Sequence, residues 1–218
     1  MKISDRAFIE VEHQLLRILP EKAIFWENEQ TLIISDVHLG KAGHFRKHGI
    51  ALPKSTNDTN LLRLDQLIEA WNPKQILFLG DLFHSEKNIE WGAFKRWRTK
   101  HHSISIVLIM GNHELYPEEE YKMLGIECIR RLNYHPFVFI HDLNEITTNI
   151  SKFIISGHIH PAVKMIGKGR QSLQIPCFYF EKNKAILPAF GTLTGSYTIK
   201  HSRKATIFGI LEHQIIHF

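Results

Sequence analysis

Five short apolar runs in this chain each end on a side chain that can bind a divalent metal ion. Asp36-Val37-His38 follows the run TLIIS, Asp81 follows QILFLG, and Asn112-His113-Glu114 follows ISIVLIMG. Further on, His141-Asp142 follows FVFI and His158-Ile159-His160 follows FIISG. Runs of this length, rich in β-branched and aromatic residues, are typical of buried strands. Ligands of α/β sheets gather beyond the carboxyl ends of the strands, so the five endings are expected to converge on one polar site.

The rest of the chain predicts helices and further strands around these runs. Apolar residues recur at helical spacing over 54–71 and 88–100, and a proline followed by three glutamates opens a third helix over 117–124. Residues 23–35 have the pattern of a hairpin, and short antiparallel strands are expected after residue 176. We therefore predict an α/β fold in which two packed mixed β-sheets are flanked by helices.

Size and composition indicate an ordinary globular protein. With 218 residues, 44% of them hydrophobic, the chain can bury a sizeable core, and we expect a single domain spanning residues 1–218. Two cysteines, Cys128 and Cys177, are too few for a disulfide framework, which favours a reducing compartment. The first 20 residues lack the apolar core of a signal peptide, and no run approaches the length of a membrane span. A cytoplasmic protein without a membrane partner is the expectation.

The residue types at the strand ends suit a pair of catalytic metal ions. Side chains two apart on a strand point to the same side, so Asp36 and His38 can reach one ion together, as can His158 and His160. Carboxylate, amide and imidazole ligands favour manganese, iron or zinc over magnesium or calcium, and the lack of a thiolate argues against a structural zinc site. Two such ions can clamp a phosphoryl oxygen and generate hydroxide near neutral pH.

Two residues have particular roles in such a centre. A carboxylate must bridge the ions, and Asp81 is the best candidate because the preceding Gly80 permits a tight turn beside a ligand. An imidazole close to the ions can assist the leaving oxygen, and we assign this role to His113.

The ordered set of motifs resembles the calcineurin-like metallophosphoesterase superfamily. The resemblance implies a four-layer sandwich of two sheets flanked by helices, with a dinuclear metal centre. It implies that Asp81 bridges the ions and that His113 is catalytic. By position, the ligands implied for the first metal are Asp36, His38 and His160, and those for the second are Asn112, His141 and His158. The family usually has glycine after the histidine matched to His141, whereas this chain has Asp142, so His135 remains an alternative ligand.

A closer resemblance rests on longer segments. DVHLG at 36–40 and GDLFH at 80–84 are similar to repair nucleases of the Mre type. Residues 39–53, 157–162, 175–180 and 187–195 are similar to the bacterial ligase-associated DNA damage response endonucleases, the PdeM-like family. This resemblance implies a metal-dependent phosphodiesterase or nuclease that works beside a DNA ligase and helicase. Of the metals that suit the ligand types, manganese is the expected ion, with iron and zinc as alternatives.

The net charge of +5 is compatible with DNA as the substrate. Lys41 and Arg46 follow the first motif directly, and we select them as substrate contacts together with His84. The basic stretch around Trp97, residues 95–102, could grip single-stranded nucleic acid, but a solvated helix end with Trp97 in the core is the favoured interpretation.

Two other classes of function are left open. One is a small-molecule phosphohydrolase, such as a nucleotide pyrophosphatase or a phosphomonoesterase, because the metal centre does not select the leaving group. The other is a non-catalytic interaction module, which has no need of the complete ligand set or of His113. The sequence does not indicate an oligomeric state.

Overall fold

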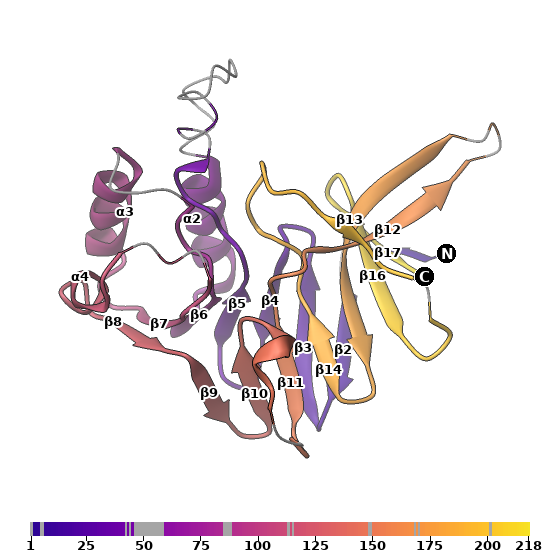
Figure 1. Cartoon of the computed structure of the whole chain (residues 1–218), viewed down its shortest axis with the longest axis horizontal. Helices are drawn as coiled ribbons and strands as arrows, with labels where there is room; N and C mark the ends of the chain where they lie inside the picture. The colour runs from indigo at the N-terminus through magenta and orange to yellow at the C-terminus, as the bar shows by residue number, and fades with distance from the viewer. Residues whose placement is uncertain are drawn as a thin grey trace.

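Two β-sheets packed face to face form the body of the molecule, and helices cover the outer face of one of them (Figure 1). This computed structural model describes residues 2–4, 7–41, 43, 45, 59–84, 89–112, 114, 116–147, 150–167, 169, 171–200 and 202–218. No helix within this described part is both long enough and apolar enough to span a membrane.

The first sheet has seven strands in the order β2-β3-β4-β5-β6-β7-β8. Strands β2 to β5 pair antiparallel, whereas β5 to β8 pair parallel and are joined by the helices. Its strands are β2 (Ala7–Val11), β3 (Gln14–Leu19), β4 (Ala23–Trp26), β5 (Thr31–Ile34), β6 (Gln75–Leu79), β7 (Ser105–Ile109) and β8 (Ile126–Ile129). The helices are α2 (Thr59–Trp71), α3 (Ile89–Lys100) and α4 (Glu118–Lys122).

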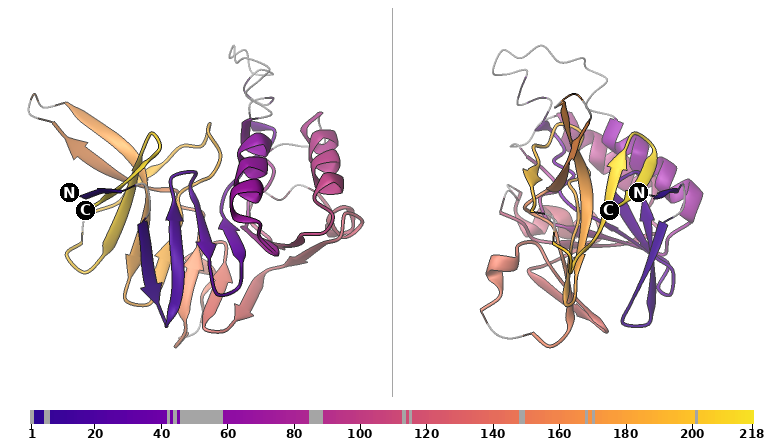
Figure 2. Two further views of the ribbon diagram at one scale, coloured as in Figure 1. Left: turned by 180° about the vertical axis from the view of Figure 1, so that it is seen from behind. Right: turned by 90° about the vertical axis from the view of Figure 1, so that its right-hand side faces the viewer.

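The second sheet has ten strands and contains both ends of the described chain (Figure 2). The N-terminal strand β1 (Lys2–Ser4) pairs with the last strand, β17 (Gln214–His217). Within this sheet β10, β11 and β14 run parallel to one another. Its other strands are β9 (Arg131–Tyr134), β10 (Phe137–Ile140), β11 (Phe153–Ser156), β12 (Pro161–Ile166), β13 (Ser172–Glu181), β14 (Lys184–Ile186), β15 (Tyr197–Thr198) and β16 (Thr206–Leu211).

The main core lies between the two sheets. Trp26 of the first sheet is fully buried there and has its ring 5.0 Å from that of Phe137 in the second sheet. A second core lies between the first sheet and the helices, where Leu64, Phe94 and Trp97 pack against apolar side chains of β5, β6 and β7. Both faces of the parallel strands are therefore apolar, which explains why they appear in the sequence as continuous hydrophobic runs.

The predicted fold class is confirmed, with one difference in the layers. In the described part of the chain the helices α2, α3 and α4 cover only the first sheet (Figure 2, left). The outer face of the second sheet has its own apolar cluster, which includes Val163, Ile175 and Tyr179, and a short 3-10 helix, η2 (Leu143–Glu145). The described residues thus form one of the two helical flanks that the four-layer resemblance implied.

The predicted elements match the structure well where the periodicity is long. The helices expected over 88–100 and 117–124 are α3 and α4, and the hairpin over 23–35 is β4 and β5. The helix expected over 54–71 is α2 from Thr59, and residues 54–58 lie outside the described residues. Strands β1, β3, β8, β9, β12 and β17 were not predicted, because short runs such as IECI and RLNY give little periodic signal.

Candidate metal centre

The strand endings after β5, β6, β10 and β11 bring their candidate ligands together in the described part of the chain. Six of the seven predicted metal ligands form two groups, and within each group the ligand atoms lie within 4.8 Å of one another. The first group consists of Asp36, His38 and His160, and the second consists of Asp81, His141 and His158. Each group therefore combines side chains from the end of a strand in the first sheet with side chains from the second sheet.

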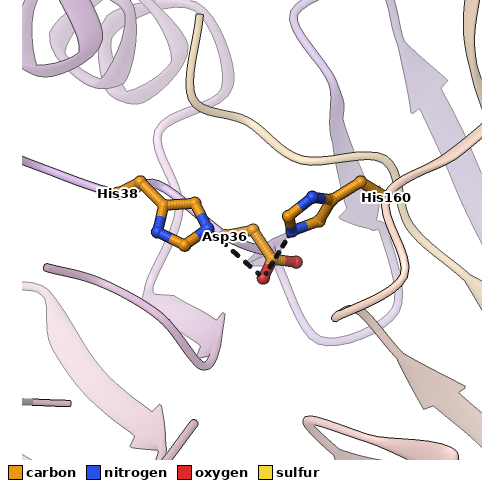
Figure 3. Close-up of side chains that lie close together, drawn as sticks. All are labelled: Asp36, His38 and His160. Atoms are coloured by element: carbon orange, nitrogen blue, oxygen red, sulfur yellow. Dashed lines mark ion pairs between the residues drawn. The ribbon is translucent and has the colours of Figure 1, made fainter. Parts of the chain in front are cut away.

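The first group is arranged around the Asp36 carboxylate, with His38 and His160 on either side of it (Figure 3). Asp36 Oδ1 lies 3.1 Å from His160 Nε2 and 3.9 Å from His38 Nε2. Asp36 is fully buried, and Asp36 Oδ1 and His160 Nε2 make no hydrogen bond of ordinary geometry. Two buried ligand atoms that face each other in this way fit a shared cation, since buried polar atoms otherwise need partners.

The charge states in this group also suit a cation. Burial lowers the pKa of His38 to about 3, so its imidazole is neutral and able to act as a ligand. Burial acts to raise the pKa of Asp36, but contact with His160 and the charges of His160 and His141 outweigh it and hold the pKa below its usual value. An ionised carboxylate beside the neutral imidazole of His38 is a donor set that borderline divalent metals prefer.

Asp81, a member of the second group, also faces the first group. Its Oδ2 is 3.8 Å from His38 Nε2, and its Oδ1 is 3.7 Å from His141 Nε2. In the second group, His158 Nδ1 lies 3.1 Å from His141 Nε2. The two oxygens of Asp81 therefore face different groups, so this carboxylate could bridge two ions. The residues present fit two divalent cations.

Backbone carbonyls fix the orientation of two of the histidines. The Nδ1–H of His141 donates to the carbonyl of Leu79 over 2.8 Å, and the Nδ1–H of His160 donates to that of Gly195 over 3.1 Å. Protonation at Nδ1 leaves Nε2 of each ring as the atom that faces its group.

The backbone is strained where the candidate ligands leave their strands. Eleven residues other than glycine have a positive φ in the described part of the chain, and five of them are candidate ligands. These five are Asp36 (φ 53°), His38 (50°), Asp81 (49°), His158 (70°) and His160 (49°). Left-handed conformations cost side-chain-bearing residues about 1–2 kcal/mol each and concentrate at functional sites.

The loops after β5, β6 and β7 are tied together beneath the site. His38 N–H donates to the Asp81 carbonyl over 3.0 Å, and Asp36 N–H donates to the Gly80 carbonyl over 3.3 Å. Glu114 connects the loop after β7 to the loop after β6, because its carboxylate accepts a 2.7 Å hydrogen bond from the Leu82 N–H. The same carboxylate accepts a 2.7 Å hydrogen bond from the Tyr121 hydroxyl. Burial raises the pKa of Glu114 to about 7 against the lowering effect of these two donors.

A sixth loop also reaches the site. It follows β14, which is parallel to β11, and its backbone contacts the first group. Phe190 N–H donates to the Ser35 carbonyl over 2.8 Å, and Gly191 N–H donates to the Asp36 carbonyl over 3.0 Å. The contribution is made by backbone atoms, so no side-chain motif signals it, although the run AILPAFG after a strand has the same form as the other endings.

The remaining predicted site residues fall into two classes. His113 and Arg46 lie outside the described residues. Asn112 is exposed on the turn after β7, and His84 lies beside the first group, with its ring 5.1 Å from that of His38. Lys41 is half-buried; burial lowers its pKa, while the nearby charges of Asp36 and Asp81 act to raise it. Lys41 and His84 are thus positioned next to the first group.

The alternative ligand His135 lies at the wrong end of its strand. It is exposed and precedes β10, whereas His141 follows β10 and is fully buried. The structure therefore brings His141, and not His135, into the second group, even though Asp142 replaces the glycine usual in the family.

The basic stretch at the end of α3 is partly anchored within the fold, and Trp97 lies in the core as the favoured interpretation predicted. Trp97 is 5% exposed and packs in the core. Arg98 is buried and donates to the Leu124 carbonyl over 3.0 Å, while Lys100 and His101 both contact the Asp65 carboxylate, at 2.8 and 2.6 Å. Lys95, Arg96, Lys100 and His102 remain exposed, so this helix end is solvated as well as anchored.

Comparison with known proteins agrees with this geometry. The model of the calcineurin-like phosphoesterase family matches residues 30–177, more than half of the chain. The structure is similar to that of nuclease MPE from Pseudomonas putida, with 27% identity and a TM-score of 0.82, over 98% of this chain and 100% of that chain. Yfce, a phosphoesterase from E. coli, shares 13% identity over 84% of this chain and 88% of its own, but its TM-score of 0.42 is too low to support an inference. Curated proteins gave no significant match.

Proposed function

This chain belongs to the calcineurin-like phosphoesterase family, and we propose that it hydrolyses phosphodiester bonds in DNA with two manganese ions held at the candidate metal centre. At the coarser level it is a metal-dependent phosphoric ester hydrolase. The proposal adds the ion, the kind of ester bond and the substrate.

The observation that carries the proposal is the position of Asp81 between the two ligand groups. One of its oxygens faces His38 and the other faces His141, at 3.8 and 3.7 Å. A carboxylate in this position can hold two ions a few ångströms apart, and a pair of ions about 3.5–4 Å apart is the arrangement that stabilises both the attacking and the leaving oxygen of an in-line displacement.

The protein's own residues then have distinct tasks. Asp36, His38 and His160 would hold one ion, and His141 and His158 would hold the other, with Asp81 shared. Asn112, on the turn after β7, would complete the second set. The bound ions supply charge stabilisation and a hydroxide nucleophile near neutral pH. His113 donates a proton to the leaving oxygen, and Lys41, Arg46 and His84 contact the phosphate backbone beside the first ion.

Two observations favour DNA. Nuclease MPE is similar over nearly the whole of both chains, which includes the part of this chain beyond the family match. The net charge of +5 favours a polyanionic substrate. A role in DNA repair beside a ligase and helicase is the further expectation, and co-purification with those proteins would test it.

The decisive test starts from metal-free protein reloaded with Mn²⁺. Hydrolysis of bis(p-nitrophenyl) phosphate is compared with that of p-nitrophenyl phosphate, for the unmodified protein, Asp81→Asn and Asp65→Asn. Asp65 is a matched control because it is an aspartate paired with Lys100 and His101 away from the centre. We expect preference for the diester, loss of activity in Asp81→Asn and full activity in Asp65→Asn.

DNA cleavage is then followed with labelled single-stranded and duplex oligonucleotides under the same conditions. Metal-dependent cleavage that Asp81→Asn abolishes would support the nuclease. Preference for the monoester, with intact DNA, would instead identify a phosphomonoesterase and contradict the proposal. Metal binding without hydrolysis of any of these substrates would contradict it as well.

A further inference from the structure

His158 is oriented differently from the other two histidines of the second sheet. His141 and His160 donate from Nδ1 to backbone carbonyls and present Nε2 to their groups. His158 instead presents Nδ1, which lies 3.1 Å from His141 Nε2, and its Nε2 points to the other side of the ring. A side chain, and not a backbone carbonyl, lies next to that nitrogen.

The neighbouring group is the carboxylate of Asp142. Asp142 Oδ2 lies 3.5 Å from His158 Nε2, which is within ion-pair range and longer than an ordinary hydrogen bond. The Asp142 side chain is 12% exposed and that of His158 is 31% exposed, so the contact is partly shielded from water. A carboxylate in this position favours the tautomer of His158 that has its proton on Nε2 and its lone pair on Nδ1.

Asp142 is itself fixed in place by the turn that it begins. It has extended backbone geometry at the N-cap of η2, where its Oδ1 accepts a 3.0 Å hydrogen bond from the Asn144 N–H. The side-chain amide of Asn144 donates to Oδ2 over 3.3 Å. The carboxylate thus has one oxygen committed to the cap and the other directed at His158.

We propose that Asp142 is a positioning residue for the second metal ion, because its carboxylate holds the His158 ring with Nδ1 facing His141 and Asp81. The inference rests on the proposed function, since it requires that this group binds a metal ion. It gives a role to the residue with which this chain departs from the glycine usual in the family.

The expected effect follows from what such outer carboxylates do at metal sites. They fix the tautomer and the ring orientation of the ligating histidine, and their removal lowers metal affinity by about 10- to 100-fold. Asp142 contacts no member of the first group in the described structure. Only the affinity for the ion at the second group is therefore expected to change.

Two variants distinguish the role of Asp142 as the N-cap of η2 from its contact with His158. Asp142→Ser keeps a good N-cap oxygen but is too short to reach His158. Asn144→Ala keeps the carboxylate and removes only the amide that supports it. Calorimetric titration of metal-free protein with Mn²⁺ measures both binding constants, and long-range ¹H–¹⁵N spectra of the metal-free protein report the tautomer of His158.

We expect two sites in the unmodified protein and in Asn144→Ala. In Asp142→Ser we expect one unchanged site, one site weakened about 10- to 100-fold, and a shift of the His158 signals away from the Nε2–H tautomer. Unchanged binding constants with an unchanged tautomer would overturn the inference, as would equal weakening of both sites. If the unmodified protein binds fewer than two ions, the proposed function fails separately, and the spectra still decide whether Asp142 sets the tautomer.

Discussion

Replacement of Gly157 by alanine tests the packing behind the first ligand group. Gly157 lies at the end of β11 immediately before His158. A Cβ at this position would lie 2.6 Å from Asp36 Oδ2 and 2.9 Å from Ser35 Cβ, and closer still to Ser35 Oγ. Both neighbours are fully buried, so neither can move aside into solvent. The new methyl group must displace the Asp36 carboxylate.

The magnitude follows from three contributions. Overpacking of a dense interior costs about 1–3 kcal/mol. Displacement of Asp36 also weakens the 3.1 Å hydrogen bond that its Oδ2 accepts from the His158 N–H, a bond to a charged group that contributes about 1.5–3 kcal/mol. Alanine also restricts the unfolded chain more than glycine does, and this effect offsets about 0.4–1 kcal/mol of the destabilisation. The net loss of unfolding free energy is roughly 2–4 kcal/mol, or a fall in Tm of roughly 5–15 °C for a chain of this size.

Thermal unfolding and Mn²⁺ titration of the metal-free protein measure the two consequences. Gly169→Ala is the matched control, because a Cβ at Gly169 would meet no atom within 4 Å. We expect Gly169→Ala to unfold and bind metal like the unmodified protein, and Gly157→Ala to be less stable and to bind Mn²⁺ more weakly. A Gly157→Ala protein with unchanged Tm and unchanged metal affinity would refute the argument that Ser35 and Asp36 are fixed against the β11 turn.

Three further predictions concern separate parts of the molecule. His113→Gln is expected to lower kcat for diester hydrolysis by about 10²- to 10⁴-fold while two Mn²⁺ ions still bind, and an unchanged kcat would remove His113 from the mechanism. Arg63→Met is expected to lower the free energy of unfolding by about 2 kcal/mol, as measured by urea unfolding. The reason is that Arg63 donates to the carbonyls of Phe190 and Glu21 and lies 4.0 Å above the Phe190 ring. Arg96→Met, at an exposed position on α3, is the control and should have little effect. Lys22→Met is expected to stabilise the protein at about pH 7, because burial, followed by the charge of Arg63, lowers the pKa of Lys22 from 10.5 to about 8. Between about pH 8 and pH 10.5 the unfolded chain binds more protons at Lys22 than the folded protein does, so the unmodified protein gains stability as pH rises. Urea unfolding across this range should show the extra stability of Lys22→Met shrinking. A constant difference in stability would contradict a lowered pKa of Lys22.

The grouping of the strand-end side chains follows from the sequence more directly than the sheet topology does. The motif after each parallel strand has a fixed relation to the carboxyl end of that strand, so Asp36, Asp81 and His141 could be placed at one edge without knowledge of the full topology. His141 could be preferred over His135 for the same reason, since only His141 follows its strand.

Other features depend on contacts that no short pattern encodes. The pairing of β1 with β17 joins the two ends of the chain, and the register of such a pair is set by packing between distant segments. The loop after β14 contributes the carbonyl of Gly195 to His160 and the N–H of Gly191 to Asp36, and backbone atoms are identical at every position in a sequence. The contact of Asp142 with His158 requires that η2 orients the carboxylate, which the substitution of glycine by aspartate indicates only after the structure is known.

The hydrogen bonds between the loops maintain the strained backbone of the candidate ligands. Five ligands leave their strands with positive φ, at a cost of about 1–2 kcal/mol each, and this conformation directs side chains from both sheets toward the same point. Such a backbone persists only where surrounding contacts determine it, and here those contacts cross between the sheets: His158 N–H binds the Asp36 carboxylate, and Phe190 N–H binds the Ser35 carbonyl. Bound ions would join the same strand ends across the same gap, so binding of metal and docking of the two sheets are expected to be thermodynamically linked. This linkage explains why a methyl group at Gly157, which would crowd Ser35 and Asp36, is expected to affect both stability and metal affinity.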